Sequence, residues 1–130
     1  MTYRNLFDSA VAQIAEQVGD YGVSDYEERA GYILASFCTR TADADKRYRA
    51  ANGHPAVTHP ELAYVELEDI FPLHAVFAPV AAYYLAANLT ADENESMSDR
   101  FFALYSDAIS SILTGLPCSI SPITDRYGLI

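Results

Sequence analysis

The sequence has few basic residues and no large basic cluster. Its 8 lysines and arginines stand against 18 aspartates and glutamates, so the formal net charge is −10. The one concentrated basic group is Lys46, Arg47 and Arg49. Binding to a nucleic-acid backbone needs clustered positive charge that neutralises phosphates. The composition therefore argues against sequence-specific nucleic-acid binding, although it is compatible with a surface past which DNA slides without sticking.

Cysteines and long apolar runs are also scarce. Cys38 and Cys118 lie far apart and form no Cys-x-x-Cys motif, so we expect no disulfide framework and a reducing, cytosolic setting. The N-terminus leads into a charged amphipathic segment instead of the apolar run of a signal peptide. The longest apolar stretch, at residues 76–87, is about a dozen residues, short of the roughly 18 expected of a membrane span. We therefore expect no membrane partner.

The first half of the chain predicts two helices. Apolar residues recur at helical spacing over residues 6–18, and two glycines near position 20 interrupt the pattern. Ser24 stands three residues before Glu27, a capping-box pattern that predicts the start of the second helix. The far end of this helix is rich in charge, with pairs such as Asp45 and Arg49 at i,i+4. We expect that end to project from the core into solvent.

The second half predicts an extended segment followed by a helical hairpin. Residues 65–68 alternate apolar with acidic side chains, as a half-buried strand or a small hairpin does. Residues 76–89 are apolar on all sides, which predicts a helix covered on several faces. Pro79 fits the first turn of this helix, where a missing N–H costs nothing. After an acidic turn at 92–95, residues 101–113 hold helical spacing and predict the partner helix.

These patterns together predict a mainly α fold, a bundle of about four helices with one short extended segment or hairpin. The chain is short enough for one domain, which we place at residues 1–116. Residues 117–130 are predicted to form an extended C-terminal tail, because Gly115 and Pro117 end the last helix. A disordered tail is normally more polar than this one, which keeps the apolar residues Ile120, Ile123, Tyr127, Leu129 and Ile130.

No group of residues has the spacing of a known catalytic or metal site. The spacing of His54 and His59 across a proline-containing loop is only a weak metal signal, so we expect His54, His59 and His74 to be ordinary surface or loop-capping histidines. Glu66 and Glu68 share one face of the predicted strand. The simpler interpretation is that this face is exposed to solvent, and the alternative is that the two carboxyls act as an acid–base pair. The sequence thus predicts no catalytic residue, no metal site, no cofactor and no enzyme. A compact helical enzyme with a site assembled across helices remains an alternative without a convergent set of residues to support it.

The acidic turn begins like a calcium-binding loop. Asp92, Asn94 and Ser96 occupy the first ligand positions, but Met97 replaces the required glycine and the final bidentate glutamate is missing. The segment therefore predicts a solvated turn. In it Ser96, three residues before Asp99, is expected to cap the following helix.

Two adjacent aromatic residues, Tyr83 and Tyr84, must point to different sides of the all-apolar helix. One interpretation places one ring against the second helix and the other against the last helix. The alternative is that one ring serves a subunit contact, because tyrosine suits a site where an apolar body needs a wet tip.

Three stretches of the sequence resemble the head–tail connector (adaptor) proteins of tailed bacteriophages and prophages. They are DIFPLHAVFAPVAAYYLAA at residues 69–87, DENE at 92–95 and FFALY at 101–105. That family has an acidic-Phe-Pro-Leu segment before an apolar helix with a Tyr-Tyr-Leu-Ala-Ala type core, then an acidic turn and an aromatic- and alanine-bearing helix. The tail element ITDRYG at residues 123–128 is more loosely similar to a family ending.

The resemblance implies a structural subunit of a homo-oligomeric ring in the virion neck, assembled in the cytoplasm of the bacterial host. Such a ring docks between the portal protein and the next neck or tail-completion protein, surrounds the DNA channel and catalyses nothing. By family analogy, the tail binds the portal through Ile123, Arg126 and Tyr127. The alternative hypothesis is a small helical regulatory or protein-binding module, a dimer that buries the helix at residues 76–89 against its copy.

Overall fold

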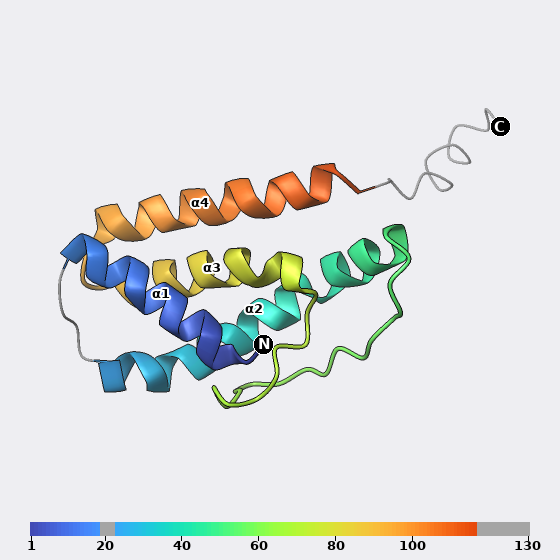
Figure 1. Ribbon diagram of the computed structural model, residues 1–130. Coiled ribbons are helices and arrows are strands. Elements are labelled where there is room, and N and C mark those ends of the chain that lie inside the picture. The colour runs from blue at the N-terminus through green and yellow to red at the C-terminus, as the bar shows by residue number, and fades with distance from the viewer. Residues whose placement is uncertain (19–22, 117–130) are drawn as a thin grey trace.

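The computed structural model describes residues 1–18 and 23–116, apart from the side chains of residues 15–25. Within these residues the fold is mainly α, as the sequence predicts, and its helices form a bundle (Figure 1). The side chain of Ser24 and the tail predicted at residues 117–130 lie outside this described part of the chain. The elements are α1 (Tyr3–Val18), α2 (Val23–Ala51), the short 3-10 helix η1 (Ala75–Phe77), α3 (Ala78–Thr90) and α4 (Glu95–Thr114).

Helix α3 lies at the centre of the bundle. It packs against α1, α2 and α4, and Figure 1 shows α4 running alongside it while α1 crosses it on another side. Nine of its 13 residues are buried, which confirms the prediction of a helix covered on several faces. Pro79 occupies the first turn, where its missing N–H leaves no hydrogen bond unmade.

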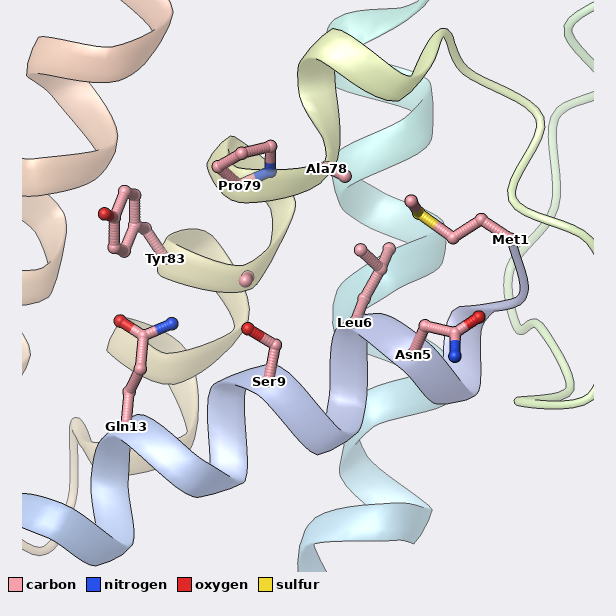
Figure 2. Close-up of a pocket in the computed structure, with 9 residues that line it drawn as sticks. Met1, Asn5, Leu6, Ser9, Gln13, Ala78, Pro79 and Tyr83 are labelled. Carbon is pink, nitrogen blue, oxygen red and sulfur yellow. The ribbon is translucent and has the colours of Figure 1, made fainter.

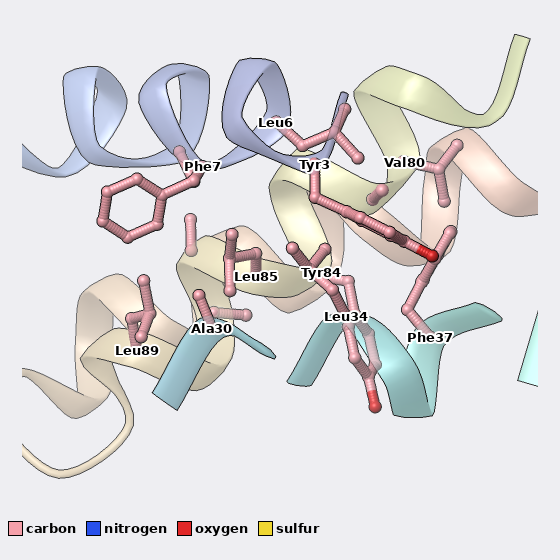
Figure 3. Packing of buried hydrophobic residues seen from close by; sticks show 14 of the residues in the cluster. Tyr3, Leu6, Phe7, Ala30, Leu34, Phe37, Val80, Tyr84, Leu85 and Leu89 are labelled. Atoms are coloured by element: carbon pink, nitrogen blue, oxygen red, sulfur yellow. The ribbon is translucent and has the colours of Figure 1, made fainter. Parts of the chain in front are cut away.

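The core forms where α1, α2 and α3 meet. Figure 3 shows Phe7 of α1, Leu34 of α2 and Leu85 of α3 pointing into the same interior, and each is at most 2% exposed. Burying one such side chain stabilises the fold by roughly 1.5–3 kcal/mol. The helical periodicity of the sequence therefore places these three helices correctly.

The turn between α3 and α4 is closed by polar contacts. Asn94 adopts an extended conformation, and its side chain accepts a hydrogen bond from the Met97 amide at 3.1 Å, so Asn94 is the N-cap of α4. The prediction that Ser96 caps this helix is wrong, because α4 already begins at Glu95. Farther along, the Ser98 hydroxyl donates to the Ala87 carbonyl at 2.8 Å and ties the two helices of the hairpin together.

The start of α2 also holds the end of α3. The Tyr26 hydroxyl donates to a Glu93 carboxylate oxygen at 2.7 Å, and the Arg29 guanidinium donates to the Asn88 carbonyl at 3.1 Å. Carbonyls in the last turn of a helix have no partner within that helix, and a cation there also suits the negative end of the helix dipole. Two residues of α2 thus fix the position of the hairpin turn.

The segment between α2 and η1 is extended and irregular, with one isolated antiparallel bridge between Thr2 and Ile70. Burial alternates as predicted over residues 65–68. The segment satisfies the first free amides of α1, because the Tyr3 amide donates to the Asp69 carbonyl at 3.0 Å and the Arg4 amide donates to the Leu67 carbonyl at 2.7 Å. These residues therefore serve as a cap for α1.

Gly31 lets the extended segment approach α2 closely. The Val65 amide donates to the Gly31 carbonyl at 3.2 Å. A Cβ atom added at Gly31 would lie 2.7 Å from the Val65 carbonyl oxygen and would also meet the Tyr64 ring. Glycine weakens a helix interior. Its presence at position 31 is explained by the Val65 backbone, which lies too close to leave room for a Cβ atom.

Candidate interaction surfaces

The residues predicted to bind the portal, Ile123, Arg126 and Tyr127, lie outside the described residues. Their partner-binding role stays a prediction. The described part of the chain contains four other places with unusual chemistry or exposure: a buried polar cluster, an acidic surface, a groove and one helix edge.

The buried polar cluster lies at the far end of α2, where the sequence predicts a solvated projection. That prediction is wrong for Asp45, whose side chain is 0% exposed. The predicted pair with Arg49 is present, with Nε donating to Asp45 Oδ2 at 2.9 Å. His59 Nε2 lies 2.6 Å from the same oxygen, and the His74 amide donates to Oδ1 at 2.8 Å. The cluster fastens the extended segment to α2.

The three histidines have three different roles. His74 Nδ1 accepts a hydrogen bond from the Val76 amide at 3.1 Å, so this residue is the loop cap that the sequence predicts. His54 is exposed and its ring lies 4.7 Å from that of His74. His59 is buried, with a side chain 6% exposed. Among the described residues, no group of three or more His, Cys, Asp or Glu side chains is arranged to hold a metal ion.

The pKa values of Asp45 and His74 depend on how deeply these groups are buried and on the groups around them. Burial alone would raise the pKa of the Asp45 carboxyl, but hydrogen bonds from the His74 amide, the His59 ring and Arg49 together lower it below its ordinary value. The pKa of His74 is lowered by burial first, and then by the nearby charges of His54 and Arg49. Asp45 is therefore held as a carboxylate, and His74 resists protonation.

His59 and Asp45 have the pairing of an acid–base dyad but not its accessibility. His59 Nδ1 is buried and has no hydrogen-bond partner in the described structure. Since a general base must reach the proton that it abstracts, a nitrogen closed to solvent cannot meet a substrate in this conformation. The geometry suits fastening of the chain rather than chemistry.

The acidic surface surrounds Arg4 at the start of α1. Glu66 and Glu68 are exposed, as the strand alternation predicts. Arg4 donates to Glu68 and to Glu27, each at 2.7 Å. These hydrogen bonds, led by the one that Arg4 donates to Glu68, raise the pKa of Arg4. The glutamates are thus solvated partners of a cation, unlike a pair of carboxyls in an apolar cleft.

A groove of about 360 Å³ lies between α1 and α3. Figure 2 shows Leu6 and Ser9 of α1 on one wall and Pro79 and Tyr83 of α3 on the other. Its lining carries no acidic or basic side chain, although the protein is strongly acidic; the full lining is Met1, Asn5, Leu6, Ser9, Gln13, Ala78, Pro79, Ala82 and Tyr83.

The two adjacent tyrosines do not lie as the first interpretation of the sequence expects, with one ring against α2 and the other against α4. Tyr84 contacts both neighbours at once, with its ring centroid 5.5 Å from that of Phe37 in α2 and 5.2 Å from that of Tyr105 in α4. Tyr83 is half-buried and lines the groove with α1. The two rings therefore do not divide between α2 and α4, and a subunit contact through Tyr83 stays a hypothesis.

Helix α4 is fully buried only near its start, and farther along Tyr105, Ala108, Ile109 and Ile112 pack half-buried against the core. Its buried residues are Met97, Ser98 and Phe101. The helix has 20 residues against 13 in α3, so at 1.5 Å per residue it is about 10 Å longer. A turn joins the two helices at one end, and the far end of α4 therefore extends past α3, as Figure 1 shows.

One side of α4, from its second turn to its end, carries an apolar stripe. Phe102, Ile109 and Leu113 stand at i, i+7 and i+11, which places them on one side of α4. Phe102 is 36% exposed, and the other two are half-buried. The nearest charged residue in the chain after Phe102 is Asp107, about 140° around the helix from Phe102. We call Phe102, Ile109 and Leu113 the α4 edge.

Comparison of the chain with protein-family models, curated proteins and solved structures gave no match. No helix in the described part of the chain combines the length and hydropathy needed to cross a membrane. The functional argument therefore rests on the residues themselves and on the surfaces that they form.

Proposed function

We propose that the chain is a structural subunit of a phage or prophage head–tail connector ring, which docks on the portal and surrounds the DNA channel. The observation that supports this best is the α3–α4 hairpin. The three stretches that most resemble the family, at residues 69–87, 92–95 and 101–105, belong to it or lead into it. Phe71 and Leu73 of the Phe-Pro-Leu segment are each 5% exposed, so this segment anchors the hairpin to the rest of the bundle.

The charge of the protein fits a channel through which DNA must move. A net charge of −10 repels phosphates and opposes sticking. The groove between α1 and α3 is lined by uncharged side chains and suits protein contacts instead. A ring subunit needs both properties, because it meets other subunits on some faces and DNA on another.

The alternative, a dimeric regulatory module, needs a different interface from the one that the sequence suggests. Helix α3 is already enclosed by α1, α2 and α4 of its own chain. A dimer would therefore have to use the groove, the α4 edge or the tail. A gene neighbourhood of portal, capsid and tail genes supports the connector, whereas an isolated gene beside a toxin or regulator contradicts it.

Deletion of residues 117–130 tests the proposed partner. We expect the helical circular dichroism signal to change little, because the helices all lie within residues 1–116 in the described part of the chain. Binding to the portal protein encoded in the same gene cluster should be abolished. The matched control is Ile123→Ser with Tyr127→Ser in the full-length chain, which should weaken binding by at least about tenfold if these side chains anchor the tail. Undiminished portal binding by the truncated chain would contradict the assignment.

A further inference from the structure

We propose that the groove between α1 and α3 holds the chain's own C-terminal segment, residues 117–130, until the portal competes for it. The proposal rests on the proposed function and adds regulation to it, because the segment assigned to portal binding is then withheld in the isolated chain. It starts from the place where the described chain ends.

The described chain ends at the same end of the bundle as the groove. Helix α4 runs back along α3 after the turn between them, so the end of α4 lies near the start of α3, as Figure 1 shows. The first two turns of α3 supply one wall of the groove, including Ala78, Pro79 and Tyr83. Leu116, the last described residue, is 8% exposed. The chain is therefore still packed on the bundle where the C-terminal segment begins.

The C-terminal segment is long enough to reach the groove. The end of α4 lies about 10 Å past the start of α3, and packed helices lie 8–10 Å apart, so the return path is roughly 20 Å. Seven extended residues, from position 117 to Ile123, span up to about 23 Å, and the whole of residues 117–130 spans up to about 46 Å. The path therefore brings both Ile123 and Tyr127 within reach of the groove.

The two walls of the groove suit an extended chain segment. The α3 wall is apolar, whereas α1 contributes Asn5, Ser9 and Gln13, which stand one turn apart and are polar without charge. Figure 2 shows Ser9 and Gln13 directed towards α3. Neither side chain makes a hydrogen bond to another residue in the described part of the chain. A segment in the groove can therefore bury apolar side chains against α3 while its peptide groups pair with the hydroxyl and the amide.

Charge and attachment favour this segment over a separate protein. Asp125 and Arg126 cancel within it, so the whole net charge of −10 belongs to residues 1–116. The segment therefore approaches an uncharged groove without the repulsion that a second acidic copy meets. A short tether also gives the segment an effective concentration in the mM range, well above that of a free partner in dilute solution.

Docking in the groove makes the segment unavailable to the portal. The groove and the portal compete for the same side chains, chiefly Ile123 and Tyr127. The apparent affinity for the portal falls in proportion to the fraction of chains whose segment is free. The isolated chain thus keeps its apolar segment covered, and the portal withdraws that segment from the groove when it binds.

Disulfide trapping in dilute protein tests the docking. In a background with Cys38→Ser and Cys118→Ser, the pair Ser9→Cys, Thr124→Cys places one thiol in the groove and one beside Ile123. Oxidation should give an intramolecular disulfide at a rate independent of protein concentration. The matched control is Asp8→Cys, Thr124→Cys, because Asp8 is equally an exposed position but is turned about 100° around α1 and does not line the groove. We expect the disulfide at Ser9 to form about tenfold faster than the control.

Two outcomes of this trapping overturn the proposal. Equal rates in the two pairs would mean that the segment passes near α1 without being held in the groove. Disulfide-linked dimers whose yield rises with protein concentration would mean that the groove holds the segment of another copy.

A charge placed in the groove tests the competition with the portal. Ser9→Glu puts a carboxylate in the lining and should release the segment, so the portal protein should bind this variant about tenfold more tightly than the unaltered chain. Ala12→Glu adds the same charge at an exposed position outside the lining and should leave portal binding unchanged. Circular dichroism should stay helical in both variants. Equal portal affinities of the two variants would contradict the competition.

The trapped disulfide gives the opposite effect. Oxidised Ser9→Cys, Thr124→Cys should bind the portal at least about tenfold more weakly than the same protein after reduction. Thr124→Cys alone, in the same background, should bind equally well under both conditions. Undiminished portal binding by the oxidised pair would overturn the proposal.

Failure of the docking and failure of the proposed function are distinguishable. Portal binding by the unaltered chain, with equal disulfide rates at Ser9 and Asp8, would overturn the docking and leave the connector assignment standing. A fast disulfide at Ser9 in a chain whose variants never bind a portal would keep the docking and remove the connector assignment.

Discussion

Helices α3 and α4 form one hairpin but have opposite relations to solvent. Helix α3 is buried on nearly every side, whereas α4 is buried only at Met97, Ser98 and Phe101. Both are rich in apolar residues, so composition alone does not distinguish them. The difference teaches that α3 is enclosed by three helices of its own chain, whereas α4 packs one side on the core through residues such as Tyr105 and Ile112 and leaves its other sides to solvent.

The largest expected effect comes from the same charge placed on each helix. Leu85→Asp in α3 puts a carboxylate where the side chain is 0% exposed. An unpaired buried charge costs several kcal/mol, about 4 or more, which should unfold the chain. Phe102→Asp in α4, at a side chain 36% exposed, should cost less than about 1 kcal/mol. Thermal melts followed by circular dichroism measure both. Equal destabilisation by the two variants would remove the distinction between the helices.

The polar cluster is the next most sensitive part of the enclosed region. Asp45→Ala leaves Arg49 and His59 without their shared partner. Loss of one member of a buried charged network costs about 3 kcal/mol. Asp43→Ala, at an exposed position two residues earlier, should change stability by less than about 0.5 kcal/mol. Urea unfolding gives both values, and a small loss for Asp45→Ala would mean that the cluster does not fasten the extended segment.

Gly31→Ala should be destabilising by about 2 kcal/mol, although alanine favours a helix by about 1 kcal/mol over glycine. The reason is the Val65 carbonyl oxygen, 2.7 Å from the added Cβ. Tyr64→Ala removes the other obstacle and should recover part of the loss in the double variant. Chemical denaturation of the four proteins in this cycle checks it. A more stable Gly31→Ala variant would show that the extended segment does not approach α2 this closely.

Mild acid should have the smallest effect on folding stability. The pKa shifts of His74 and Asp45 determine whether stability rises or falls. The pKa of His74 is lowered from 6.5 in the folded protein, chiefly by burial, so protons bind the unfolded chain more readily. Stability is therefore complete above about pH 6.5 and declines as the pH falls below it. The lowered pKa of Asp45, below its ordinary 3.8, adds a second decline at still lower pH. Urea midpoints measured between pH 7.5 and pH 3 should fall, and His74→Gln should lose the first decline. A midpoint that rises on acidification would contradict this arrangement.

The local parts of this structure follow from the sequence. Helical periodicity and the all-apolar stretch place α1, α2, α3 and α4, because each pattern depends on residues a few positions apart. The alternation at residues 65–68 likewise predicts which side chains are buried. The cap at Asn94 could have been found, since asparagine is a favoured N-cap and precedes a helix that starts with an acidic residue.

The long-range parts do not follow. Asp45 reads as one charge among several on a helix, and only the return of the extended segment surrounds it with His59 and the His74 amide. The need for Gly31 depends on the same return. The sequence contains one signal of this return, because a glycine inside an otherwise helical pattern often marks a position where another segment approaches the helix closely. The groove and the α4 edge are products of packing between helices, and the predicted portal-binding residues lie beyond the described chain.

The central claim is that the bundle built around the enclosed α3 is the subunit of a ring that docks on the portal. Electron microscopy of the chain mixed with the portal protein of its own gene cluster tests it most directly, with the Ile123→Ser, Tyr127→Ser double variant in parallel. The account predicts an added ring of density around the portal channel for the unaltered chain, and none for the folded double variant at the same concentration. Bare portal particles with the unaltered chain would contradict the ring, and equal rings with both proteins would contradict the portal-binding role of these two residues.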